Sequence, residues 1–432
     1  MKSIKKLTAL VLSLILLVTC FAACNSDNGD TPNTDDGSVN SQGADDTNSG
    51  TEGKTLKIWV PSEETEITAT MMESFKDAHP EYADVTFDIT VMGVDDSCDA
   101  IKQDADSAAD VFLYPSGAIA ELTAAGLLYP ITYGADEITA SHGEAAIKSC
   151  TMDEYLYGVP HSPNSWFMYY NKSMYTEEEV KSLETMMAKD LGDGIYNFSC
   201  ALSDSWYLSA FFFAAGCTLY GEDGTVATEC SWNDETGYKV GEYLIDLVNN
   251  NKKFVNDADG LAGSLMSEGK LGALCSGTWS AETLKEALGD NYAACKLPTI
   301  NINGADCQLS NFADFKAFGV NTRTASPQLA MEVAAWLGNE ESQLIRFENI
   351  ATAPTIASLA DNPTVAASVE IAALTEQTNY STPNPTTSQL SEYWVPAAAF
   401  GSGIVNGDIT KDNLQSSLDS MVVSFTTKLA EQ

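Results

Sequence analysis

The chain has 432 residues, enough for two or three domains, and its 61 acidic and 22 basic side chains give a formal net charge of −39. This negative field repels phosphate backbones, so the composition argues against nucleic acid as a partner. Because 44% of the residues are hydrophobic and 9% are aromatic, the acidity belongs to the surface of a globular protein and not to a disordered acidic chain.

The first 24 residues predict a secretory signal. Three lysines precede an apolar run from Leu7 to Val18, which is short for a membrane span. The exit sequence Phe-Ala-Ala-Cys, which ends at Cys24, resembles the lipobox of bacterial lipoproteins, in which the cysteine is diacylated. We therefore expect 1–24 to be a lipoprotein signal peptide and Cys24 to carry the lipid. An uncleaved anchor helix, or a lipobox that ends at Cys20, remains an alternative.

Residues 25–53 predict a disordered tether. This stretch consists almost entirely of Asn, Asp, Ser, Thr and Gly, with seven acids and no base. It has too little apolar area to offset the entropy cost of ordering the chain. The rest of the chain keeps 54 acidic and 19 basic residues, so the folded part is strongly acidic as well.

From residue 54 onward the chain alternates strand and helix patterns. The first elements, in order, are a strand at Leu56–Val60, a helix with Ile67, Met71 and Phe75 on one face, a strand at Val85–Val91, a short helix at Asp95–Gln103 and a strand at Asp110–Tyr114. Apolar stripes predict later helices around 240–248 and 327–337. Strands interleaved with helices predict an α/β fold with a mainly parallel sheet that is covered on both faces.

Aromatic residues gather at positions where strands should end or helices begin. They are Tyr114, Trp166 beside Asn164, Trp206, Trp279 and Trp394. Ligands of open α/β sheets bind outside the carboxyl ends of the strands. An aromatic face packs against the C–H face of a sugar, while Asn, Asp and Glu bind the hydroxyls. The pattern therefore indicates a carbohydrate cleft.

The other tryptophans do not follow this pattern. Trp59 and Trp336 lie in apolar periodic segments, so we assign them to the core, and Trp232 is left unassigned.

Enzyme and metal motifs are missing from the sequence. It has no G-x-S-x-G elbow, no Walker loop and no G-x-G-x-x-G after a strand. The eight cysteines beyond residue 53 form no C-x-x-C pair, so we expect no metal site, and buried thiols or an occasional bridge remain possible. We expect no enzyme and no cofactor. A glycoside hydrolase stays a rival interpretation, because so many acids supply carboxylate pairs by chance.

An ordered series of segments resembles one protein family. The segments are Lys54–Val60, Ala108–Tyr114, Gly126–Ile131, Tyr157–Pro160, Met168–Lys172, Phe212–Gly216, Gly269–Ala273, Gly277–Trp279, Leu297–Thr299 and Ser391–Trp394. Together they resemble the extracellular solute-binding proteins (family 1) of carbohydrate ABC importers, especially the maltodextrin-binding group and its Gram-positive lipoprotein type.

The resemblance implies a periplasmic-binding-protein-like, two-lobe Venus-flytrap fold with three hinge crossovers. By position, these crossovers fall near His161–Trp166, Phe312–Lys316 and Leu359–Asp361. The implied first lobe is 54–162 plus 316–359, and the implied second lobe is 163–315 plus 360–432.

The resemblance also implies a ligand site between the lobes. Aromatic sugar platforms match Tyr114 in the first lobe and Trp206, Trp279 and Trp394 in the second. Polar contacts match Glu63, Glu64 and Asn164, with Trp166 next to Asn164. The family pattern has an acid and a base after the first strand, where this chain has two acids, and often an acid-base pair after Tyr114, where it has Pro-Ser-Gly.

The implied function is capture of maltooligosaccharides by a monomer that is lipid-anchored at the extracellular face of the cell membrane. Its partners are the sugar and the membrane permease subunits of an ABC importer. A binding protein for another oligosaccharide, a secreted glycoside hydrolase, and a surface protein that only captures glycans are the alternatives.

Overall fold

The computed structural model describes residues 54–249, 253–257 and 260–427. The predicted signal peptide, Cys24 and the tether at 25–53 lie outside the described residues and stay predictions. Within the described part, no helix combines the length and apolar character needed to cross a membrane.

The first sheet has six strands in the order β15-β14-β3-β1-β2, with β6 paired to β14. Its strands are β1 (Thr55–Val60), β2 (Thr86–Val91), β3 (Val111–Pro115), β6 (Val159–Asn164), β14 (Phe312–Val320) and β15 (Thr382–Pro383). Strands β1, β2 and β3 are parallel, as the sequence predicts, whereas β14 runs antiparallel to β3 and β6. The predicted order of the first elements is therefore confirmed.

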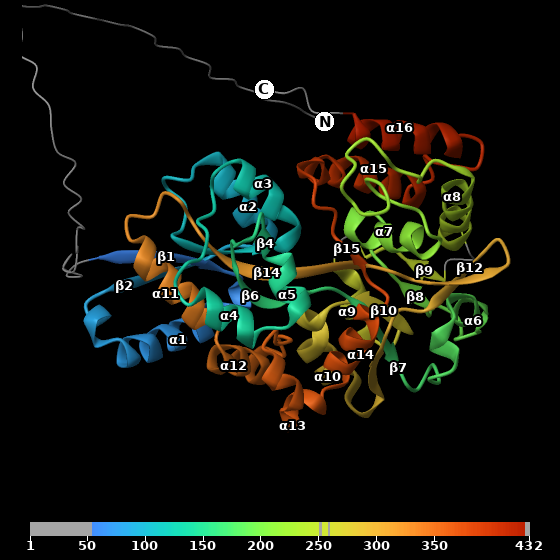
Figure 1. The fold of residues 1–432 in the computed structure, drawn as a ribbon. Coiled ribbons are helices and arrows are strands. Elements are labelled where there is room, and N and C mark those ends of the chain that lie inside the picture. The colour runs from blue at the N-terminus through green and yellow to red at the C-terminus, as the bar shows by residue number, and fades with distance from the viewer. Residues whose placement is uncertain (1–53, 250–252, 258–259, 428–432) are drawn as a thin grey trace, which may run out of the picture. The chain divides into compact units, whose positions relative to one another are not determined.

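Helices cover both faces of this sheet (Figure 1). They are α1 (Thr65–Ala78), α2 (Val94–Gln103), α3 (Ile119–Ala124), α4 (Ala135–Ser141), α5 (Glu144–Ser149), α11 (Pro327–Gly338) and α12 (Glu340–Ile350). Helix α1 forms because Met71 and Phe75 recur on one face, where both are buried, and its apolar stripe packs on the sheet. Trp336 lies partly buried against the same core, and its ring N–H donates to the Met71 carbonyl at 3.1 Å.

The second sheet has five strands in the order β11-β7-β10-β8-β9. Its strands are β7 (Phe167–Asn171), β8 (Phe198–Ser199), β9 (Phe254–Val255), β10 (Ala273–Ser276) and β11 (Tyr292–Cys295). The helices of this half are α6 (Leu183–Ala188), α7 (Ser205–Ala214), α8 (Glu235–Val248), α9 (Leu261–Ser267), α10 (Ala281–Leu288), α13 (Pro363–Ala366), α14 (Val369–Thr378), α15 (Trp394–Val405) and α16 (Leu414–Thr426). The unassigned Trp232 is fully buried here and stacks on Phe212 at 4.2 Å.

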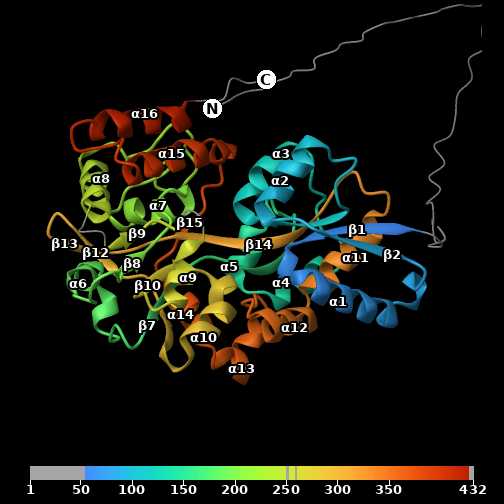
Figure 2. The same cartoon turned by 180° about the vertical axis from the view of Figure 1, so that it is seen from behind.

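The two sheets belong to separate hydrophobic cores. We call the first sheet with its core and helices the first lobe, and the second sheet with its core and helices the second lobe. Strand β14 joins the lobes, because Phe312 at its start packs in the second core and Phe318 near its end packs in the first. Figures 1 and 2 show this long strand running between the two halves. Strand β6 leaves the first core at Val159, and the next segment enters the second core at Trp166. The third connection follows α12. The lobe boundaries given above stay a prediction.

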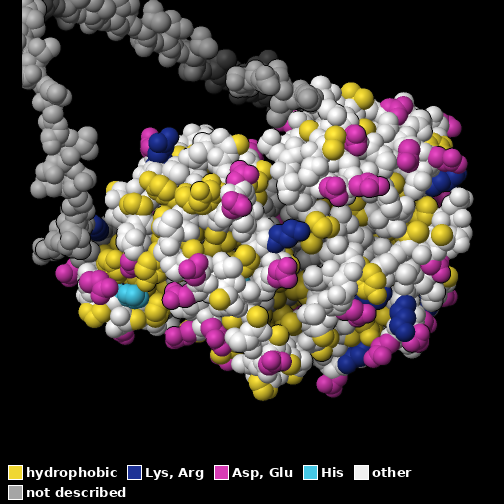
Figure 3. Space-filling view, in the orientation of Figure 1, with side chains coloured by type: hydrophobic (Ala, Val, Ile, Leu, Met, Phe, Trp, Pro, Cys, Tyr) yellow, Lys and Arg dark blue, Asp and Glu magenta, His cyan; other side chains and the backbone are white. Residues whose placement is uncertain are grey.

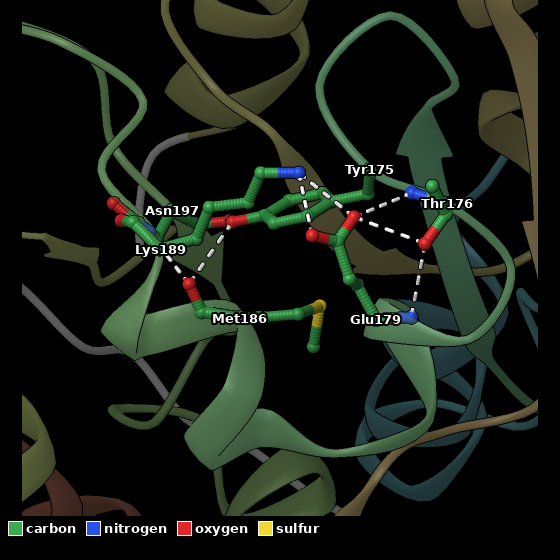
Figure 4. A network of polar contacts seen from close by, with 6 residues as sticks. All are labelled: Tyr175, Thr176, Glu179, Met186, Lys189 and Asn197. Atoms are coloured by element: carbon green, nitrogen blue, oxygen red, sulfur yellow. Dashed lines mark hydrogen bonds and ion pairs between the residues drawn. The ribbon is translucent and has the colours of Figure 1, made fainter.

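The second lobe also contains a polar network around α6 (Figure 4). Lys189 lies 2.7 Å from Glu179, whose pKa is lowered to about 2 mainly by the hydrogen bond from that ammonium group. The Asn197 side chain donates to the carbonyls of Met186 and Lys189 at 2.6 and 2.8 Å. These bonds attach α6 to the sheet and satisfy the polar groups at the end of this short helix.

Candidate functional site

The floor of the candidate site is the buried carboxylate of Asp314, on β14. It accepts hydrogen bonds from the Ser116 hydroxyl at 2.6 Å, the Gly117 amide at 3.1 Å, the Asn164 side chain at 2.6 Å and the Asn384 side chain at 2.8 Å. Burial raises the pKa of Asp314 above its ordinary value, although the hydrogen bonds from Ser116, Asn164 and Gly117 oppose this rise. One carboxylate thus connects the first lobe, β6, β14 and the segment that follows β15.

Above this floor lies a cavity of about 500 Å³ with walls from both lobes. The first-lobe wall is made by α2 and the turn into α3, and the second-lobe wall by α7, α15 and the turn before it. Five carboxylates line the cavity: Asp95, Asp99, Glu121, Asp204 and Asp314. The wall is therefore rich in hydrogen-bond acceptors, which suits a ligand with many hydroxyl donors.

Three of the four predicted platform rings lie together on the second-lobe side. Trp206, in the first turn of α7, and Trp394, in the first turn of α15, both line the cavity. Trp279 follows β10, is 45% exposed, and its ring lies 6.1 Å from that of Trp206 at an interplanar angle of 30°. An exposed tryptophan beside partly buried ones is a surface on which a flat apolar ligand face can stack.

Local capping positions the Trp206 ring. The side chain of Asp204 caps α7 by accepting from the Trp206 amide at 2.8 Å, which fixes where the helix begins. Trp394 is held from behind by Tyr393 and Phe312, with ring centroids 5.0 and 5.8 Å away. These rings are therefore held at the cavity wall by the fold itself.

The fourth predicted platform, Tyr114, does not line the cavity. Its side chain is fully buried in the first core, and burial raises its pKa well above the usual value. Gly158 and Gly319 make room for the side chain, since a Cβ at Gly158 would lie 2.6 Å from the Tyr114 hydroxyl and one at Gly319 would lie 3.0 Å from its ring. The next residues, Pro115 and Gly117, line the cavity instead.

Trp166 is also buried and does not line the site. Its ring is fully enclosed in the second core, 4.6 Å from the ring of Tyr207. The neighbouring Asn164 does line the cavity, although its side chain already donates to Asp314. Of these two predicted residues, Asn164 lies at the cavity wall and Trp166 lies in the core.

The two glutamates after β1 have different surroundings. Glu63 is exposed, and its carboxylate accepts from the Ser62 hydroxyl at 3.2 Å. Glu64 is buried, with one oxygen 2.9 Å from His161 Nε2 and 3.1 Å from Arg346 Nε. Burial alone would raise the pKa of Glu64, but His161 and Arg346 lower it to about 2. Glu64 thus ties the end of β1 to β6 and α12 and is not exposed to a ligand.

Sequence reasoning did not select Asp314 or Lys316 as site residues. Both lie in the segment that the resemblance marked as a crossover, on the same side of β14 by strand alternation. Polar residues at alternate positions of a crossing strand were the available signal. Asp314 lines the cavity, and Lys316 Nζ lies 5.8 Å above the ring of Trp279.

The described part of the chain contains no group of three or more His, Cys, Asp or Glu side chains arranged for a metal ion. All eight described cysteines are unpaired. Figure 3 shows acidic side chains over both lobes of the face in view, with fewer basic ones.

Comparisons with known proteins bear on this site. The family model described as bacterial extracellular solute-binding protein matches residues 70–373. The galactooligosaccharide-binding protein of Bacillus subtilis (strain 168) is 28% identical over 363 residues, 81% of this chain and 84% of the relative. The maltodextrin-binding protein of the same strain is 25% identical over 341 residues, 76% of this chain and 80% of the relative.

Solved structures agree on the fold. A chain solved with acarbose is 34% identical, with a TM-score of 0.80, and the match covers 87% of this chain and 99% of that one. The maltodextrin binding protein from L. casei BL23, solved without ligand, is 24% identical with a TM-score of 0.75, and 87% and 100% are covered. The predicted two-lobe, periplasmic-binding-protein-like α/β fold is confirmed by these likenesses.

Proposed function

Because this chain belongs to the family of bacterial extracellular solute-binding proteins, we propose that it captures an oligosaccharide between its lobes and delivers it to the permease of an ABC importer. Members of this family bind solutes and are not enzymes, so the prediction that the chain is not an enzyme is confirmed. The glycoside hydrolase alternative is therefore set aside.

The observation that carries this proposal is the cavity between the lobes. Its second-lobe wall has aromatic rings, Trp206 and Trp394 with Trp279 beside them, and its first-lobe wall has carboxylates. A sugar needs both kinds of surface, because its C–H faces stack on rings while its hydroxyls donate to carboxylates. A cavity of about 500 Å³ has the size of ordinary small-molecule sites.

We propose a maltooligosaccharide as the ligand. The relative named as a maltodextrin-binding protein and the chain solved with acarbose support an α-glucan fragment. A galactooligosaccharide is the second candidate, favoured by the relative of that name, which matches over more of both chains than the maltodextrin-binding relative does. The two candidates share the chemistry of a neutral, hydroxyl-rich chain and differ in the configuration of the C4 hydroxyl and in their glycosidic linkages.

The proposed cellular setting follows the family. The chain acts outside the cell membrane, held by a lipid on Cys24, and presents the closed, sugar-loaded form to membrane permease subunits. Closure follows from binding if the sugar has higher affinity for the closed state than for the open one. A monomer is sufficient for this role, since both walls of the cavity come from one chain.

The test is a titration of the purified protein with gluco-, galacto-, xylo- and fructo-oligosaccharides, read by tryptophan fluorescence and calorimetry. We expect micromolar binding of maltotriose, about 8 kcal/mol in total. Chromatography of the incubated sugar should return it unshortened. Tighter binding of galactotriose would select the second candidate, and no binding anywhere in the panel would refute the proposed function.

A further inference from the structure

Lys316 occupies a position that no other lysine of the described chain shares. It lies on the connecting strand β14, paired with Pro115 of β3 on one side and Ser162 of β6 on the other. Its side chain is half-buried, and its ammonium nitrogen lies 5.8 Å above the ring of Trp279 in the second lobe. A residue of the connecting strand therefore reaches the exposed platform ring.

The ammonium group of Lys316 also faces first-lobe acids. It lowers the pKa of Glu64, after the larger effects of His161 and Arg346, and it opposes the burial that raises the pKa of Asp95. Yet among the described residues Lys316 Nζ makes no hydrogen bond and no ion pair. None of its three N–H donors is bonded to another described residue, so all three are available to a ligand.

The donor balance of the cavity explains what such a group can do. Carboxylates only accept hydrogen bonds. The hydroxyl, ring and linkage oxygens of a sugar accept hydrogen bonds too, and these acceptors need donors from the protein. The amide donors of the wall, Asn164 and Asn384, are directed to Asp314. Lys102 is directed to Asp99 and Glu121 at 3.2 and 3.1 Å. Lys316 is the lysine near the rings whose donors are uncommitted.

We propose that Lys316 is a ligand-binding and specificity-determining residue, which donates hydrogen bonds to acceptor oxygens of the sugar that stacks on Trp279. This inference rests on the proposed function. The ammonium now lies over the ring face that the sugar would cover, so binding moves it from the ring to the edge of the sugar, where its three donors meet oxygen acceptors. An ammonium group close to the Trp279 face also favours sugars that carry oxygen acceptors within its reach over sugars that are deoxygenated at the same positions.

The experiment compares the affinity of the full chain and its variants for the tightest-binding sugar of the panel. We expect Lys316→Met to weaken binding at least tenfold and Lys316→Arg to stay within about threefold of the wild type, because arginine also donates. The control is Lys239→Met, on α8, whose ammonium lies 5.6 Å above the ring of Tyr238 outside the cavity. It should leave the affinity unchanged.

A series of monodeoxy sugars separates hydrogen bonding from a general structural effect. For the sugar that lacks the acceptor of Lys316, wild type and Lys316→Met should bind equally, while the thermal midpoints of the two proteins agree. If Lys316→Met binds as well as the wild type, or better, Lys316 merely covers Trp279 and the inference is overturned while the proposed function stands. If the wild type binds no sugar, both are overturned.

Discussion

The two walls of the cavity are built on different principles. On the first-lobe side the residues expected to touch sugar, Tyr114 and Glu64, are buried, and Glu64 is part of an internal ion network. On the second-lobe side Trp206 and Trp394 stay at the surface of the cavity. The difference separates two roles: Tyr114 and Glu64 support the fold, whereas the second-lobe rings are available to a ligand.

The largest expected effect tests the first-lobe side. Replacing Arg346 by Met leaves Glu64 buried without the guanidinium group that donates to it, so we expect a loss of about 3–5 kcal/mol in the free energy of unfolding. Urea denaturation measures it. The matched control is Glu179→Gln, which removes a more exposed ion pair in the second lobe and should cost clearly less stability than Arg346→Met. Equal losses for both variants would contradict the structural role of the Glu64 network.

The dependence of the unfolding free energy on pH tests the same ion network of Glu64. The pKa of Glu64 is about 2 in the folded chain against an ordinary value of 4.5, so its ionised form stabilises the fold fully above pH 4.5. This contribution is lost as the pH falls from 4.5 towards 2. We expect the difference in unfolding free energy between wild type and Glu64→Gln to shrink by about 2 kcal/mol from pH 6 to pH 3. A difference that does not change with pH would mean that the fold does not lower the pKa of Glu64.

The second-lobe side should show the reverse pattern. Trp206→Ala, Trp279→Ala and Trp394→Ala should each weaken sugar binding at least tenfold, about 1.4 kcal/mol or more, because each removes a stacking face. Calorimetric titration measures this loss. Tyr114→Phe, which removes only a buried hydroxyl, is the control and should bind like the wild type. Unchanged affinity in the tryptophan variants would discard the assignment of the platform.

The comparison also shows where sequence reasoning succeeds. Local periodicity places β1, α1 and β3 correctly, because burying an apolar stripe is decided within a few residues. The tryptophans at helix starts were found for a similar reason, since capping residues and turns mark the end of a strand. The resemblance to solute-binding proteins, which depends on the order of many short segments, is confirmed by the family match.

The burial of Glu64 and Tyr114 and the position of Asp314 in the site were not predicted, because they depend on long-range packing. Glu64 pairs with Arg346, 282 residues away, and no local pattern announces that partner. Tyr114 is buried because Gly158, in the bend before β6, and Gly319, on β14, leave space for its side chain. Whether a polar or aromatic residue at a strand end faces a cavity or the core depends on such distant neighbours. Asp314 was missed for the same reason, since its donors come from three separate segments.

The hydrogen bonds of Asp314 have a mechanical consequence. They join the segments that carry Ser116, Asn164 and Asn384 to one carboxylate, so we expect these segments to move together when the lobes change their relative orientation. A fluorophore attached next to Asn384 should therefore report movement of either lobe. This coupling makes the protein a suitable starting scaffold for a carbohydrate biosensor.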